Sequence, residues 1–124
     1  MSAAVKVAPL ALAALPVLLT AADRDPLAGR VPGPPERCVH VGPGDGFSAL
    51  DKRTILFDPG PGRVWRTEPL GACPALEPLT TLIVQVQGGQ VCEHDRFQVL
   101  EPGQSIPSSF CFFGKFTPYE RVKR

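Results

Sequence analysis

The sequence predicts a mostly β fold, a small antiparallel sheet or partial barrel of five to six short strands that is stapled by disulfides. Three observations support this prediction. Beyond position 37 the apolar residues come in runs of strand length, separated by turn residues. The 124 residues include 15 prolines and 12 glycines, which favour turns and loops over helices. The chain also has four cysteines, all of which lie within residues 38–111.

The strands are expected where β-branched, aliphatic and aromatic residues cluster. The connection Pro59-Gly60-Pro61-Gly62 joins two of these runs and predicts a hairpin, since proline lacks the amide hydrogen that a central strand needs. A short helical turn at 47–52 is a weak alternative to an all-strand interpretation. The strand runs lie at 38–41, 53–58, 63–67, 81–87, 90–92 and 96–100, and residues 110–113 supply a last aromatic cluster.

The clearest hairpin signal is at residues 81–92. Alternation places Leu82, Val84 and Val86 on one face of a strand, and Gly88-Gly89 suits a two-residue turn. The return strand 90–92 would then place Val91 opposite Val86 and Cys92 opposite Gln85.

Residues 1–22 have the pattern of a secretory signal peptide. Lys6 precedes an uncharged apolar run from Val7 to Leu19, and small residues precede a cut after Ala22. This run is shorter than the roughly 20 residues that a membrane-spanning helix needs. No cysteine follows it directly, so we expect no lipid anchor. The predicted location is therefore periplasmic or secreted.

The mature chain divides into three parts. Residues 23–37 are rich in proline and charge, which predicts a disordered linker. Residues 38–119 hold most of the apolar side chains and form the predicted disulfide-stapled domain, and residues 120–124 are a basic tail. Without Lys6 the mature chain has 12 basic and 12 acidic residues, which argues against nucleic acid and anionic membrane surfaces as partners.

An even number of cysteines in a short exported domain predicts two disulfides, and four cysteines allow three pairings. Their placement favours Cys73–Cys92, because Cys73 precedes the hairpin that carries Cys92. The remaining bridge, Cys38–Cys111, would join the first and last strands of the domain.

A metal site is the alternative interpretation of the same residues. Cys38-Val39-His40 and Cys92-Glu93-His94 repeat a Cys-x-His pattern, and residues two apart on a strand share a face. Together Cys38, His40, Cys92 and His94 would form a tetrahedral set with zinc-compatible chemistry. Export favours oxidation of the cysteines over metal binding. No Cys-x-x-Cys motif supports a redox role.

Catalytic signals are weak. The chain has no Gly-x-Ser-x-Gly elbow, no phosphate-binding loop and no His-Glu-x-x-His motif. A hydrolase would have to use Asp51 with Asp95 or His94. Trp65 and the Phe110, Phe112 and Phe113 group are interpreted as core rather than as a pocket, because aromatic residues dominate burial in small cores.

A series of motifs occurs in order along the chain: Cys38, Leu50 to Phe57, Cys73 to Leu76, Cys92, Phe97 to Leu100 and Ser109 to Pro118. With these motifs the chain, from Leu50 onward, resembles a family of small exported proteobacterial proteins known as a domain of unknown function. The resemblance covers about two-thirds of the chain and includes all four cysteines in order. It departs at the two Cys-x-His pairs, which are not typical of the family. The resemblance implies an exported compartment and a stapled architecture, and no activity.

The sequence therefore predicts an exported periplasmic protein that is a non-enzymatic structural or ligand- or protein-binding domain. The alternatives are the zinc module and, with less support, the hydrolase. No cofactor is expected, and the expected partner is a periplasmic protein or a small ligand.

Overall fold

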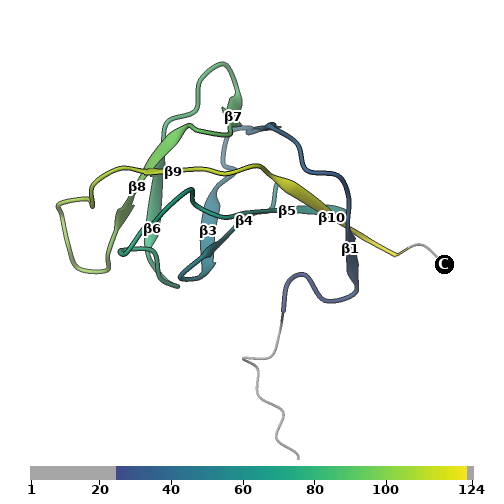
Figure 1. The fold of residues 1–124 in the computed structure, drawn as a ribbon, viewed down its shortest axis with the longest axis horizontal. Helices are drawn as coiled ribbons and strands as arrows, with labels where there is room; N and C mark the ends of the chain where they lie inside the picture. The colour runs from purple at the N-terminus through teal and green to yellow at the C-terminus, as the bar shows by residue number, and fades with distance from the viewer. Residues whose placement is uncertain (1–24, 123–124) are drawn as a thin grey trace, which may run out of the picture.

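The computed structural model describes residues 25–122. The predicted signal peptide, residues 1–22, lies outside the described residues, as do the last two residues of the predicted tail. Residues 25–122 form ten short strands and no helix, so the predicted fold class is confirmed, although the strands are more numerous than the expected five to six (Figure 1). The strands are β1 (Arg30–Pro32), β2 (Cys38–His40), β3 (Phe47–Asp51), β4 (Thr54–Phe57), β5 (Arg63–Thr67), β6 (Thr81–Val84), β7 (Gln90–Cys92), β8 (Arg96–Leu100), β9 (Cys111–Phe112) and β10 (Thr117–Arg121).

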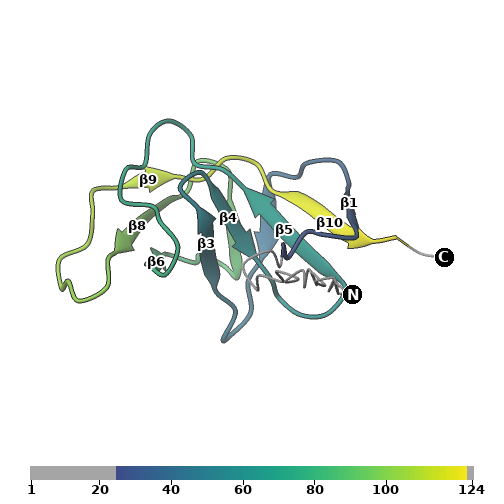
Figure 2. The same cartoon turned by 90° about the horizontal axis from the view of Figure 1, so that it is seen from below.

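The strands form three antiparallel sheets, of order β1-β10-β5-β4-β3, β6-β8-β9 and β2-β7. Figure 2 shows β3, β4 and β5 side by side, with β10 and β1 beyond β5 and with β6, β8 and β9 on the other side. The two larger sheets meet at two places: Pro69, which follows β5, pairs with Phe113, which follows β9, and β3 lies against β6. They therefore curve around one core as a partial barrel.

The core lies between these sheets and is built from alternating inward-facing side chains. Phe57, Phe97, Phe113 and Phe116 are fully buried, and the Phe97 and Phe113 ring centroids are 4.4 Å apart. Aromatic pairs at such distances add about 1 kcal/mol to the stabilisation from burial alone. The other buried members of the core are Val39, Ile55, Trp65, Cys73, Leu76, Val91, Val99 and Cys111.

The interpretation of the aromatic residues as core is correct for two of them and wrong for the other two. Trp65 is 9% exposed and Phe113 is fully buried. Phe110 and Phe112 are 47% and 44% exposed. Successive strand residues point to opposite faces, and Cys111 and Phe113 take the inward positions. Phe110 and Phe112 consequently face outward.

The prediction of a disordered linker at 23–37 is wrong for its second half, and the prediction of a basic tail at 120–124 is wrong for Glu120 and Arg121. Residues Arg30–Pro32 form β1, which pairs with β10 at the edge of the five-stranded sheet. Glu36 then exchanges two backbone hydrogen bonds with Phe116, of 2.7 and 2.9 Å. β10 extends to Arg121, beyond the predicted boundary at 119. Proline is tolerated at a sheet edge because its missing N–H can face away from the ladder.

The predicted hairpin at 81–92 forms only at its turn. Gly88 and Gly89 both have positive φ, and Gln87 pairs with Gln90. The flanking strands then separate, since β6 pairs with β8 whereas β7 pairs with β2. Val91 therefore lies opposite Val39 rather than Val86. The helical turn considered at 47–52 is the strand β3, which pairs with β4.

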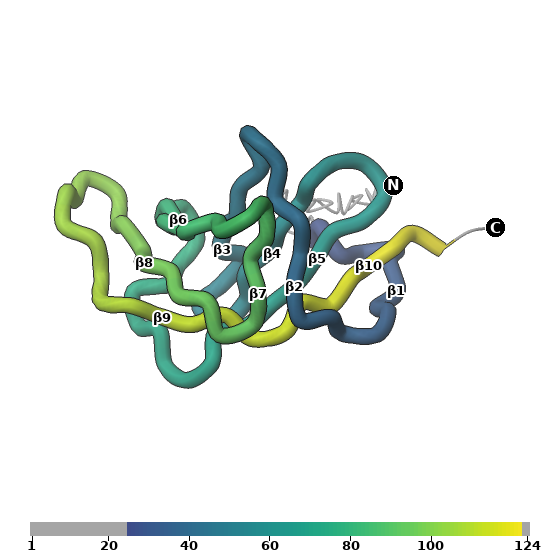
Figure 3. Tube along the Cα trace, turned by 90° about the horizontal axis from the view of Figure 1, so that it is seen from above, coloured from purple at the N-terminus to yellow at the C-terminus, as the bar shows by residue number. Residues whose placement is uncertain are grey.

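The two disulfides are present, but the preferred pairing is wrong. The bridges are Cys38–Cys92 and Cys73–Cys111. β7 leaves the hairpin and lies beside β2 (Figure 3). Cys38 is consequently directly opposite Cys92 in the strand register. Cys73 reaches Cys111 because the segment before it runs along β9, where the N–H of Leu70 donates to the carbonyl of Phe112. Two disulfides are consistent with an oxidising compartment.

Within residues 25–122 the structure contains no helix with the length and apolar character needed to cross a bilayer.

Candidate ligand-binding cleft

One wall of the candidate cleft is the turn between β3 and β4. The Asp51 carboxylate accepts a hydrogen bond of 2.8 Å from the backbone N–H of Arg53, which is a common way for aspartate to close a tight turn. This hydrogen bond is the main reason why the pKa of the Asp51 carboxyl is lowered; burial opposes it, and Thr54 and Arg66 lower the pKa further. The closed turn presents Lys52 and Arg53 as adjacent exposed cations.

The opposite wall is the segment from Glu68 to Pro74, which is fastened to the chain around β9. The N–H of Gly114 donates to the carbonyl of Glu68 at 2.9 Å, and the N–H of Leu70 donates to Phe112 at 2.8 Å. Gly114 is required for this approach, because a Cβ atom there would lie 2.6 Å from the Glu68 carbonyl oxygen. The Cys73–Cys111 disulfide fixes the far end of the same segment.

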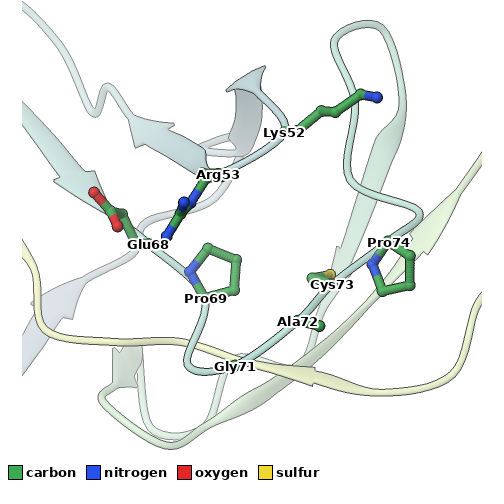
Figure 4. A pocket seen from close by; sticks show the side chains of 8 residues that line it. All are labelled: Lys52, Arg53, Glu68, Pro69, Gly71, Ala72, Cys73 and Pro74. Atoms are coloured by element: carbon green, nitrogen blue, oxygen red, sulfur yellow. The ribbon is translucent and has the colours of Figure 1, made fainter.

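Between these walls lies a cavity of about 460 Å³. Its volume is within the range of roughly 300–1,000 Å³ found for small-molecule sites. Figure 4 shows Arg53 reaching toward Pro69, whereas Lys52 points away from it, and Ala72, Cys73 and Pro74 continue the wall below. The cavity is thus apolar along one side and cationic at its rim. It is lined by Lys52, Arg53, Glu68, Pro69, Gly71, Ala72, Cys73 and Pro74.

The charges around the cleft are unevenly paired. The carboxylate of Glu68 lies 2.6 Å from the guanidinium of Arg66, and Asp51 is engaged by the backbone of its own turn. Neither Lys52 nor Arg53 forms an ion pair or side-chain hydrogen bond with another of residues 25–122. The nearby carboxylates therefore have partners, whereas the two cations at the rim have none among the described side chains.

The structure does not bring the predicted zinc ligands together. Cys38 and Cys92 are bonded to each other, so their sulfur atoms are not available as thiolate ligands. His40 is exposed on β2. His94 lies in a turn with φ of 78°, where the shared-face argument for residues on a strand does not apply. In the described part of the chain no cluster of three or more metal-ligating side chains occurs.

The predicted hydrolase residues do not converge either. Asp51 lies at the β3–β4 turn beside Lys52. His94 and Asp95 line a different, smaller cavity of about 190 Å³ with Arg96. The Asp95 carboxylate accepts a hydrogen bond of 2.8 Å from the backbone N–H of Cys92, which assigns it a role in the turn between β7 and β8.

The sequence did not identify the cleft because its residues come from two turns that carry no binding or catalytic motif. Lys52 was placed in a possible helical turn and Arg53 at the start of a strand run, whereas Pro69 and Pro74 lie outside every predicted strand run. The available signal was the number of prolines near a cysteine, which indicates a rigid loop next to a disulfide. Which turn faces this loop depends on the sheet order.

Comparison with known proteins gives no relative from which a function could be transferred. No family model matches the chain, and neither a curated protein nor a solved structure matches it. The resemblance based on the four cysteines therefore stays a prediction.

Proposed function

We propose that this protein is exported to the periplasm or secreted, and that it is a non-enzymatic domain that binds a small ligand in the cleft between the β3–β4 turn and residues 68–74. The observation that carries this proposal is the cavity of about 460 Å³ with an unpaired guanidinium at its rim. Binding sites typically combine an apolar wall with a few polar groups that orient the ligand. The separation of Asp51 from His94 and Asp95 supports binding rather than hydrolysis.

The rigidity of the cleft supports the same proposal. Both walls are held by backbone hydrogen bonds, and one is also held by a disulfide. Because the cleft is already formed, the protein loses little conformational entropy when a ligand binds. Export is supported by the signal-peptide pattern of residues 1–22 and by the two disulfides.

The binding proposal can be tested by NMR with defined probes. Isotope-labelled mature protein would be titrated separately with octanoate, octanamide and octylamine, which share a chain and differ in charge. We expect at least one probe to shift the backbone amide signals of Arg53, Gly71 and Ala72 and to leave Gly88 unchanged. The absence of such shifts with all three probes would contradict the proposal.

A variant that fills the cleft provides the matched control. Ala72 is exposed and lines the cavity, so Ala72→Trp should block binding without disturbing the core. Gln104→Trp adds the same side chain to an exposed loop outside the cleft and should leave binding unchanged. Equal binding by both variants would place the probe elsewhere.

Export is tested separately by expressing the full chain and sequencing the N-terminus of the protein recovered from the periplasm or medium. The expected N-terminus is Asp23, which follows cleavage after Ala22. Denatured, unreduced protein should contain no free thiols. A full-length product in the cytoplasm with four free thiols would refute export.

A further inference from the structure

The charge arrangement in the cleft narrows the class of ligand. Arg53 is the cation that reaches toward the apolar wall in Figure 4, and its guanidinium has no partner among the described side chains. A guanidinium presents paired N–H donors that match the two oxygens of a carboxylate. The site therefore offers one contact, and this contact fits a planar anion with a single charge.

The neighbouring carboxylates set an upper limit on the charge of this anion. Glu68 lines the same cavity as Arg53, and Asp51 lies in the same turn. Glu68 is compensated by Arg66 at 2.6 Å, so a single negative charge on Arg53 meets little repulsion. A doubly charged phosphate group would lie near both carboxylates with one directly available guanidinium, which is less favourable.

The apolar wall indicates what the anion is attached to. Pro69, Ala72 and Pro74 lie along the cleft beside the buried Cys73, and none of them offers a side-chain hydrogen bond. A hydrocarbon chain or ring could remove this surface from water at no polar cost. A small anion without an apolar part would leave this surface exposed to water.

We infer that the ligand is a small amphiphile with one carboxylate, whose carboxylate pairs with Arg53 and whose apolar body packs on Pro69, Ala72 and Pro74. This inference rests on the proposed binding function of the cleft. Lys52 points away from the wall, so it contributes to the attraction of the anion over distance rather than to direct contact.

The first test compares octanoate with octanamide, which has the same chain without the charge, and with octyl phosphate. The dissociation constant of octanoate should be at least about tenfold lower than that of octanamide, the usual scale for one charge-assisted contact. Equal binding of octanoate and octanamide would overturn the carboxylate assignment and leave the binding function intact. Tighter binding of octyl phosphate would also overturn it. If no probe binds the cleft, both proposals fail.

Variants of Arg53 test the contact itself. The Arg53 side chain is exposed and unpaired, so Arg53→Gln should not affect folding, and octanoate affinity should fall about tenfold while octanamide affinity stays unchanged. Arg53→Lys keeps the charge but loses the paired donors, and we expect it to restore only part of the affinity. Arg96→Gln removes a charge at a separate cavity and is the matched control. An equal loss in Arg53→Gln and Arg96→Gln would refute the contact.

A carboxylate of this kind can belong to a free acid or to the end of a peptide chain. Acetylated dileucine, with a free or an amidated carboxyl end, separates the two sources from each other. Tighter binding of the free-acid peptide than of octanoate would assign the carboxylate to a chain end, whereas the reverse order would assign it to a free acid. Amidated peptide that binds as tightly as its free acid would contradict the inference.

Discussion

Removing either disulfide should lower the free energy of unfolding by about 4 kcal/mol. The bridged cysteines are 54 residues apart in Cys38–Cys92 and 38 residues apart in Cys73–Cys111. In the chain-entropy treatment, loops of these lengths correspond to about 4.2 and about 3.9 kcal/mol at room temperature. The entropic contributions of the two bridges are therefore nearly equal.

Burial should separate the two variants. Cys73 and Cys111 are 8% and 5% exposed and belong to the core, whereas Cys38 and Cys92 are half-buried. Replacement of Cys73 and Cys111 with alanine also removes two packed sulfur atoms, so this variant should be the less stable of the two. Total stabilities for about 100 ordered residues are roughly 5–15 kcal/mol. The two bridges together correspond to about 8 kcal/mol, so a variant that lacks both should lie near the threshold of unfolding.

The assay is urea unfolding followed by the fluorescence of Trp65, which is the single tryptophan and belongs to the core. Peptide mapping of the unreduced wild-type protein should first recover Cys38 joined to Cys92. Recovery of Cys73 joined to Cys92 would refute the pairing. An unchanged urea midpoint in the variant that lacks Cys73 and Cys111 would refute the energetic reasoning.

Three further predictions concern single residues. Thr67→Val should lower the free energy of unfolding in urea by about 1–3 kcal/mol, because the buried Thr67 hydroxyl donates to the Gly114 carbonyl at 3.1 Å. Thr67→Ser should retain most of this stability, and equal losses in the two variants would contradict the hydrogen-bond explanation. Gly114→Ala should cost about 3 kcal/mol, since the added methyl group meets the Glu68 carbonyl, whereas Gly46→Ala, with open space around it, should be nearly neutral. Asp51 should titrate below the ordinary aspartate pKa when followed by NMR, so its stabilising effect is complete above the unfolded-state pKa and is lost as the pH falls through the folded-state pKa. Asp51→Asn should remove that part of the acid dependence, and an Asp51 pKa at or above the ordinary value would contradict the role of the Arg53 N–H.

The local sequence pattern was sufficient to predict the strands that are themselves rich in strand-forming residues. β4, β5 and β8 are dense in β-branched, aliphatic and aromatic side chains, and each lies within a predicted run. β1 escaped prediction because its partner β10 is far away in sequence, as the pairing of Arg30 with Arg121 shows. Pro32 and the prolines that follow it resembled those of a linker, since composition does not distinguish an edge strand from a disordered segment.

Strand pairing was the harder problem, and the disulfide error follows from it. Gly88-Gly89 correctly predicted a tight turn, but a turn does not fix how far its flanking strands stay paired. β7 is short and lies beside β2, so Cys92 faces Cys38. The cleft depends on pairing in the same way, because contacts with β9 bring residues 68–74 opposite the β3–β4 turn.

The two disulfides therefore differ in what they hold in place. Cys38–Cys92 joins the small β2-β7 sheet, which contributes no residue to the cleft. Cys73–Cys111 fastens the apolar wall to β9, and Cys73 itself lines the cavity. Loss of the first bridge should weaken the fold and leave octanoate affinity unchanged in the molecules that remain folded. Loss of the second bridge should weaken both the fold and the octanoate affinity. The wall would keep the backbone hydrogen bonds of Glu68 and Leu70, but residues 71–74 would lose their own attachment to β9. Unchanged octanoate affinity in the variant that lacks Cys73–Cys111 would show that the wall is positioned by its hydrogen bonds alone.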